Sequence, residues 1–136
     1  MSKDDLATVE ALWKASAERD LETAAQLLDP AIVLYGTRGG LDEKRVLTGP
    51  DAYLGYMTDV EAQWENFDFE VERLIDAGEA IVVFLLEKGR SGRGEAELLN
   101  ETAMAFKVNE GKVVEARGFL DREEAIEAAR QGKLSG

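Results

Sequence analysis

The chain contains no histidine and no cysteine among its 136 residues. This excludes an imidazole base, a thiol nucleophile, disulfides and the usual zinc ligands. Proton chemistry would have to come from carboxylates, phenols, amides or a bound cofactor, and no motif points to a cofactor or a metal. The catalytic candidates are Tyr35, in a short apolar run, and Asn100 and Glu101, in a long alternating run that also contains Thr102.

Each candidate also has an ordinary structural explanation. A buried tyrosine or asparagine needs a hydrogen-bonding partner, and a neighbouring strand, a bound water or a ligand could each supply one to Tyr35 or Asn100. Glu101 becomes a general base only if its strand slips by one residue, because a carboxylate in an apolar pocket has a raised pKa. Otherwise Glu101 is a solvated carboxylate or lies on a dimer face.

The overall charge narrows the range of partners. The formal charge is -12, from 28 acidic and 16 basic residues, which disfavours nucleic acids and anionic membrane surfaces. The longest apolar run, "AIVVFLL" at 80–86, is too short to span a bilayer, and the first residues do not resemble a signal peptide. We expect one cytoplasmic domain, residues 1–136, that binds neither nucleic acid nor membrane.

The periodicity of apolar residues predicts two helices, a strand, a third helix, four antiparallel strands and a last helix. Helices are expected at 2–17, at 20–28 and from Pro50, and the last of these carries Tyr53, Met57, Val60 and Trp64 on one stripe. Strands are expected at 31–36, 66–75, 80–88, 95–108 and 112–120, followed by a helix that Asp121 caps. The stretch "TRGGLDEKRVL" at 37–47 is expected to form a polar loop. The order predicts an α+β fold with the helices on one side of the sheet.

The last hairpin can be given a register from its turn. A three-residue turn at 109–111 would place Val108 opposite Lys112. Counting outward puts Thr102 opposite Gly118 on a face that points toward the helices and that also includes Asn100, Met104, Ala116 and Leu120. The other face mixes charged and apolar residues, as a partly covered outer or dimer face would.

Four stretches resemble one family over almost the whole chain. They are "RDLETAAQLLDPAIVLYG", "LTGPDAYLGYM", "LIDAGEAIVV" and "NEGKVVEARGFLDREEAIEAARQG". They resemble the SnoaL-like proteins of the nuclear transport factor 2-like and ketosteroid isomerase-like superfamily. This resemblance implies a cone-shaped α+β barrel, in which a strongly curved, mainly antiparallel sheet wraps around three N-terminal helices, with a short C-terminal helix. It also implies a pocket inside the cone and commonly a homodimer.

The resemblance does not bring the superfamily's catalytic groups with it. The catalytic base of the steroid isomerases would fall at about Tyr35, and their oxyanion-stabilising acid at about Met104. Their oxyanion tyrosine would fall near Leu12 or Trp13, and the acid that many SnoaL-like relatives carry before the last aromatic matches Gly118. Steroid-type isomerisation by that set of residues is therefore disfavoured.

Two functions remain open at this point. One is an isomerase, cyclase or dehydratase that acts on a small apolar cyclic or polyketide-like substrate through Tyr35, Asn100 or Glu101. The other is a non-catalytic ligand-binding or dimerisation module, and a protein-docking role is a weaker third possibility. The residues expected to line the pocket, several of which could instead be plain core, are Trp13, Tyr53, Tyr56, Met57, Trp64, Thr102, Met104, Ala116, Gly118 and Leu120.

Overall fold

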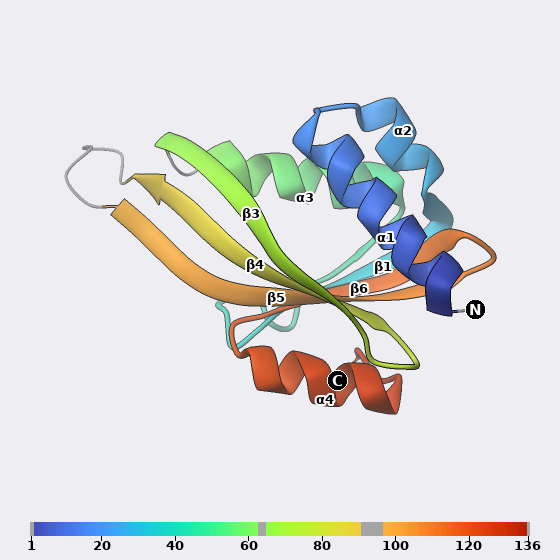
Figure 1. The fold of residues 1–136 in the computed structure, drawn as a ribbon. Coiled ribbons are helices and arrows are strands. Elements are labelled where there is room, and N and C mark those ends of the chain that lie inside the picture. The colour runs from blue at the N-terminus through green and yellow to red at the C-terminus, as the bar shows by residue number, and fades with distance from the viewer. Residues whose placement is uncertain (1, 63–64, 91–96, 136) are drawn as a thin grey trace.

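A computed structural model describes residues 2–62, 65–90 and 97–135, and within these residues four helices pack against a six-stranded sheet (Figure 1). The helices are α1 (Ser2–Ala17), α2 (Leu21–Gln26), α3 (Pro50–Ala62) and α4 (Arg122–Gln131). The strands are β1 (Leu28–Arg38), β2 (Val46–Thr48), β3 (Glu65–Asp76), β4 (Ile81–Arg90), β5 (Glu97–Asn109) and β6 (Lys112–Phe119). The predicted α+β architecture is confirmed, with a strongly curved sheet around three N-terminal helices and a short C-terminal helix.

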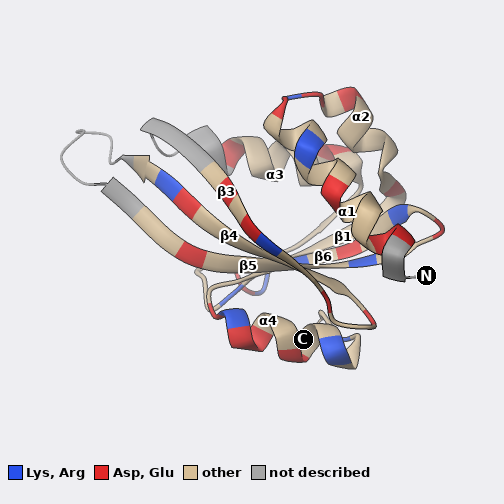
Figure 2. Cartoon of the chain, viewed as in Figure 1, with Lys and Arg blue, Asp and Glu red and all other residues tan. Residues whose placement is uncertain are grey.

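The sheet is mixed and not wholly antiparallel. Its strand order is β2-β1-β6-β5-β4-β3, and β1 pairs with β6 in parallel while the other neighbours are antiparallel. Acidic and basic positions both occur along β3 and β4 (Figure 2). Among the described residues, no helix is both long and apolar enough to cross a bilayer.

The helices occupy both faces of the sheet, so the prediction that they share one side is wrong. The helices α1, α2 and α3 cover the concave face, where the core includes Leu12, Val83 and Phe106. Helix α4 lies against the opposite face (Figure 1) and contributes Ala125, Ala128 and Ala129 to a second core. These alanines pack against Val82, Ala103, Ala105 and Phe119 of the sheet. The face predicted to be a partly covered outer or dimer face is covered in part by helix α4.

Strand β1 is longer than the predicted strand at 31–36. It begins at Leu28 and includes Asp29 and Pro30, and its register against β6 shifts between Leu28 and Val33. Pro30 cannot donate a backbone hydrogen bond, so the sheet accommodates it at an irregularity. Residues 46–48 form β2 at the edge of the sheet, although Val46 and Leu47 were expected to belong to the loop. Such a short strand depends on its pairing with β1 and leaves little periodic signal.

The turn of the last hairpin differs from the predicted one. Asn109 pairs with Lys112, so the turn has two residues, Glu110 and Gly111, with φ values of 51° and 77°. These angles match the mirror-image turns that suit hairpins. A register shift at Lys107 then adds a second one-residue displacement. Beyond Lys107 the predicted pairs are wrong by two residues, but two is the period of a strand, so the predicted faces are correct there. Next to the turn the shift is one residue, and Val113 lies in the core of the concave face.

The pairs in the final register define the inner surface of the cone. Met104 lies opposite Gly118, and Phe106 opposite Ala116, in place of the predicted pairs.

The predicted start of the last helix is confirmed, because the Asp121 carboxylate accepts hydrogen bonds from the backbone N–H groups of Glu123 and Glu124.

Candidate functional site

A cavity of about 240 Å³ opens on the concave face of the sheet. It is bordered by β1, the turn after it, α3, and strands β3 to β6. Its apolar lining includes Leu34, Met57, Phe69, Leu85 and Met104. Its polar lining includes Thr37, Tyr56, Glu87 and Thr102, and no lysine or arginine occurs among the described lining residues.

Six of the residues expected in a pocket line this cavity: Tyr56, Met57, Thr102, Met104, Gly118 and Leu120. Trp13, Tyr53 and Ala116 lie instead in the adjoining core and are buried. The indole of Trp13 packs edge-on against Phe69, with ring centroids 5.5 Å apart. Its buried N–H has no hydrogen-bond acceptor among the described residues. Trp64, the tenth residue, falls outside the described residues.

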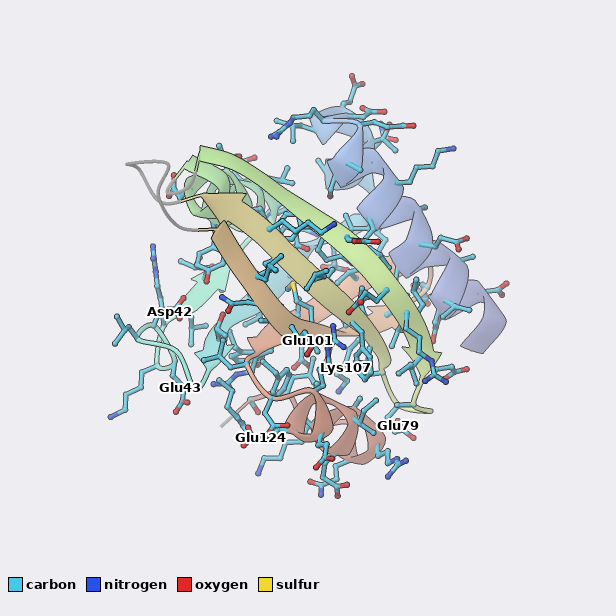
Figure 3. The ribbon with its side chains drawn as sticks, turned by 60° about the vertical axis from the view of Figure 1, so that its left-hand side comes forward. Asp42, Glu43, Glu79, Glu101, Lys107 and Glu124 are labelled. Atoms are coloured by element: carbon cyan, nitrogen blue, oxygen red, sulfur yellow. The ribbon has the colours of Figure 1, made fainter. Side chains whose placement is uncertain are left out.

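The three predicted catalytic residues are not brought together around the cavity. Tyr35 borders the cavity, but its ring lies 5.8 Å from the Arg117 guanidinium, and burial, then Glu115, raises the pKa of its phenol. Asn100 and Glu101 are exposed and do not line the cavity, although Asn100 of β5 is the cross-strand partner of Glu87 of β4, a residue of the cavity wall. Glu101 pairs with Arg122 of α4 at 3.5 Å, and Figure 3 places it on β5 on the side of α4.

The carboxyl group that does line the cavity belongs to Glu87 of β4, which was not among the predicted residues. Burial raises its pKa. The described residues provide no hydrogen-bond or ion-pair partner for its side chain, so the carboxylate has nothing to offset its desolvation. The sequence did hold a signal: Val83 and Leu85 face the core, and Glu87 is the next residue on the same face of the strand.

Across the cavity, the Tyr56 hydroxyl belongs to a small polar group. It donates a 2.7 Å hydrogen bond to Oδ2 of Asp42, which lies in the turn that connects β1 to β2 (Figure 3). Burial raises the pKa of Tyr56, a hydrogen bond with Thr37 lowers it, and Asp42 raises it. Because its proton is already used, this phenol fastens α3 to the turn and is not available as a donor to a ligand.

Arg117 holds the same turn from the opposite face of the sheet. The guanidinium is buried and donates three hydrogen bonds to backbone carbonyl oxygens: Gly36 at 3.0 Å, Leu134 at 2.8 Å and Glu43 at 3.1 Å. These bonds tie β1, the turn and the C-terminal segment to β6. Desolvation lowers its pKa, but a guanidinium remains charged at any physiological pH.

Comparisons with known proteins identify the family. The model of the SnoaL-like domain matches residues 9–116. The chain belongs to the SnoaL-like family. No curated protein matches its sequence.

Several solved structures share the SnoaL-like fold. TerC, co-crystallised with polyporic acid, is 18% identical, with 91% of this chain and 98% of TerC covered and a TM-score of 0.72. A Catenulispora acidiphila protein with a ketosteroid isomerase-like fold, in complex with trimethylamine, is 13% identical, with 82% of each chain covered and a TM-score of 0.66. A Mycobacterium tuberculosis LEH-like epoxide hydrolase is 17% identical, with 96% of this chain and 92% of that one covered and a TM-score of 0.66. At these identities the likeness establishes the fold alone.

Gly118 occupies the position at which the family resemblance implied an acid. It lines the cavity, and a Cβ atom added to it would lie 3.0 Å from the Thr37 hydroxyl oxygen of the neighbouring strand. A side chain at this position therefore needs Thr37 to move. In this SnoaL-like protein a residue of β1 fills the space beside Gly118, and the cavity receives its carboxyl group from Glu87 instead.

Proposed function

We propose that this SnoaL-like protein is an enzyme that transfers a proton on a small apolar organic molecule, with Glu87 as the general acid or base. The observation that carries the proposal is that the Glu87 carboxyl lines the cavity. Burial there raises its pKa. A raised pKa brings a carboxylic acid closer to neutral pH, where it can both take up and release a proton.

The size of the cavity limits the substrate. A cavity of roughly 150 Å³ holds a benzene molecule, so about 240 Å³ suits one or two rings. An isomerase, cyclase or dehydratase acting on a small cyclic or polyketide-like compound fits this space. The relatives co-crystallised with polyporic acid and bound to trimethylamine support an organic ligand.

Hydrogen exchange tests this chemistry without a known substrate. The protein should accelerate the exchange of the α-protons of α-tetralone in D₂O, followed by proton NMR after subtraction of the buffer rate. The acceleration should rise with pH and level off above the pKa of Glu87, because a general base acts in its ionised form. Glu87→Gln should lower it by about 100-fold, the low end of what general-base catalysis provides.

Matched variants separate the cavity from the rest of the sheet. Glu70→Gln removes the same charge from an exposed position on β3, where Glu70 pairs with Lys88 at 2.8 Å, and should leave the exchange rate unchanged. Glu101→Gln should also retain the rate, because Glu101 is exposed and does not line the cavity. Full exchange activity in Glu87→Gln, or loss in Glu101→Gln, would refute the assignment of the acid or base to Glu87.

The second candidate function is a non-catalytic ligand-binding or dimerisation module. Two observations favour it: the family's acid position is the glycine Gly118, and the Tyr56 proton is held by Asp42. This function predicts tight binding of a cyclic ketone without exchange of its protons. We also propose that the protein is a homodimer and is located in the cytoplasm. Sedimentation equilibrium at micromolar concentration tests the oligomeric state, and fractionation of the source cells tests the location.

A further inference from the structure

The charges around the cavity are one-sided. Among the described lining residues, Glu87 supplies a carboxylate and no residue supplies a cation. Arg122 reaches the adjacent strands from the face that carries α4, where it donates to the backbone oxygens of Thr102 and Leu85 and pairs with Glu72 and Glu101. Its charge is thus already balanced. A carboxylate, sulfonate or phosphate entering the cavity would meet a like charge without a compensating group.

An aromatic ring lies directly beside this carboxylate. Phe69 of β3 is the cross-strand partner of Glu87 of β4, and both side chains line the cavity. Directly opposed residues of antiparallel strands have Cβ atoms about 4.5–5.5 Å apart. Organic cations are recognised by this combination, because a ring face attracts the cation through its quadrupole and a carboxylate attracts it by direct charge.

We propose that the natural ligand carries an organic ammonium group, protonated or quaternary, which lies between Glu87 and Phe69 with the apolar part of the ligand in the remainder of the cavity. The inference rests on the proposed small-molecule function and specifies its substrate class. The ammonium group supplies the counter-charge that the described residues do not give Glu87. Methyl groups on the nitrogen would contact Met57 and Leu85, two apolar residues of the lining.

A pair of probes with one shape and different charge tests the inference. Benzyltrimethylammonium and neopentylbenzene differ in having a cationic nitrogen or a neutral carbon at the same position. Benzenesulfonate serves as the anionic probe. Dissociation constants at pH 8 are measured by ligand-observed NMR on the full chain. We expect the cation to bind about tenfold more tightly than its neutral counterpart, as a partly desolvated ion pair beside a ring allows.

Variants connect this preference to named residues. Glu87→Gln should weaken the binding of benzyltrimethylammonium by about tenfold and change the affinity for neopentylbenzene by no more than about twofold, since only the charge is removed. Phe69→Leu should weaken the cation with a smaller effect on the neutral probe. Glu70→Gln, with the same change in net charge on the same strand as Phe69, should leave all affinities unchanged. Circular dichroism and the midpoint of thermal unfolding establish that each variant is folded.

Each outcome separates this inference from the proposal beneath it. Equal affinities for the two isosteric probes, or tighter binding of benzenesulfonate, would overturn the ammonium assignment while the small-molecule cavity stands. If neither benzyltrimethylammonium nor neopentylbenzene binds, the result counts against the small-molecule function itself and against the ammonium assignment with it. Loss of the charge preference in Glu70→Gln would show that the net charge of the protein, and not the site, attracts the cation.

Discussion

Gly118 provides a quantitative test of how the cavity wall is packed. A Cβ added at this position lies 3.0 Å from Oγ1 of Thr37, 3.6 Å from its Cγ2 and 3.7 Å from its Cβ. Thr37 also interacts with Tyr56, so its displacement would disturb the polar group across the cavity. Gly118→Ala should therefore destabilise the protein through one identified contact, and removing that contact should reverse the effect.

The magnitude follows from two opposing terms. Overpacking of this kind costs about 1–3 kcal/mol. Replacing glycine by alanine in a strand returns roughly 0.5–1 kcal/mol, because the unfolded chain loses conformational freedom. Gly118→Ala should thus lower the free energy of unfolding by about 1 kcal/mol. In a Thr37→Ala background the nearest contact of the new methyl group is Cβ at 3.7 Å, an ordinary separation. There the same substitution should be stabilising by about 0.5 kcal/mol.

The parent protein, Gly118→Ala, Thr37→Ala and the double variant form a double-mutant cycle. Urea denaturation of these four proteins gives the coupling energy between the two positions, which should be between about 1 and 3 kcal/mol. Gly55→Ala is the control, because an added Cβ at Gly55 of α3 would have no atom within 4 Å apart from its chain neighbours and the backbone of its own helix. It should be stabilising to the same extent in both backgrounds. Additive effects of Gly118→Ala and Thr37→Ala would refute the claim that Thr37 excludes a side chain from position 118.

Two further predictions concern Glu87, in the wall of the cavity, and Arg117, on the opposite face of the sheet. Burial raises the pKa of Glu87, so the folded protein resists an ionisation that the unfolded chain undergoes freely. The resulting loss in the free energy of unfolding is absent in acid. It grows as the pH rises from the ordinary glutamate pKa through the raised pKa of the folded protein. Glu87→Gln should therefore be more stable than the parent at pH 8 and about equal to it at pH 4, whereas a constant difference would contradict the cause given for the shift. Arg117→Met removes three hydrogen bonds to backbone carbonyl oxygens, two of them buried, and should cost about 3 kcal/mol in urea denaturation. The exposed Arg130→Met should change stability by less than about 0.5 kcal/mol.

The sequence predicted the elements whose local signals are strong. The apolar stripe of α1, Pro50 at the start of α3 and the Asp121 cap of α4 each define an element by contacts within a few residues. Strand β2 and the parallel pairing of β1 with β6 depend on residues far apart in the chain, such as Leu34 and Ala116. Turn signals and periodicity carry no information about such pairs, so these features were missed.

Beyond Lys107, the faces of the last hairpin were predicted correctly although its pairs were not. A two-residue turn and the register shift at Lys107 each displaced the pairing by one residue, and together they preserved the alternation. Met104 and Gly118 therefore line the cavity as expected, but opposite each other. Glu87 was overlooked because it follows a continuous apolar run at 80–86, and a run without alternation does not show which face of the sheet its last residues point to.

Glu87 connects the stability of the protein with its function. A half-buried carboxylate without a described partner destabilises the fold, and an apolar residue or glutamine at this position would stabilise it. Groups held in such surroundings are concentrated at functional sites, where a shifted pKa or a missing counter-charge is used on a ligand. The Glu87→Gln variant therefore has a joint expectation: higher stability at pH 8 together with loss of proton exchange and of the preference for ammonium. A gain in stability without either loss would mean that the carboxylate serves neither chemistry nor binding.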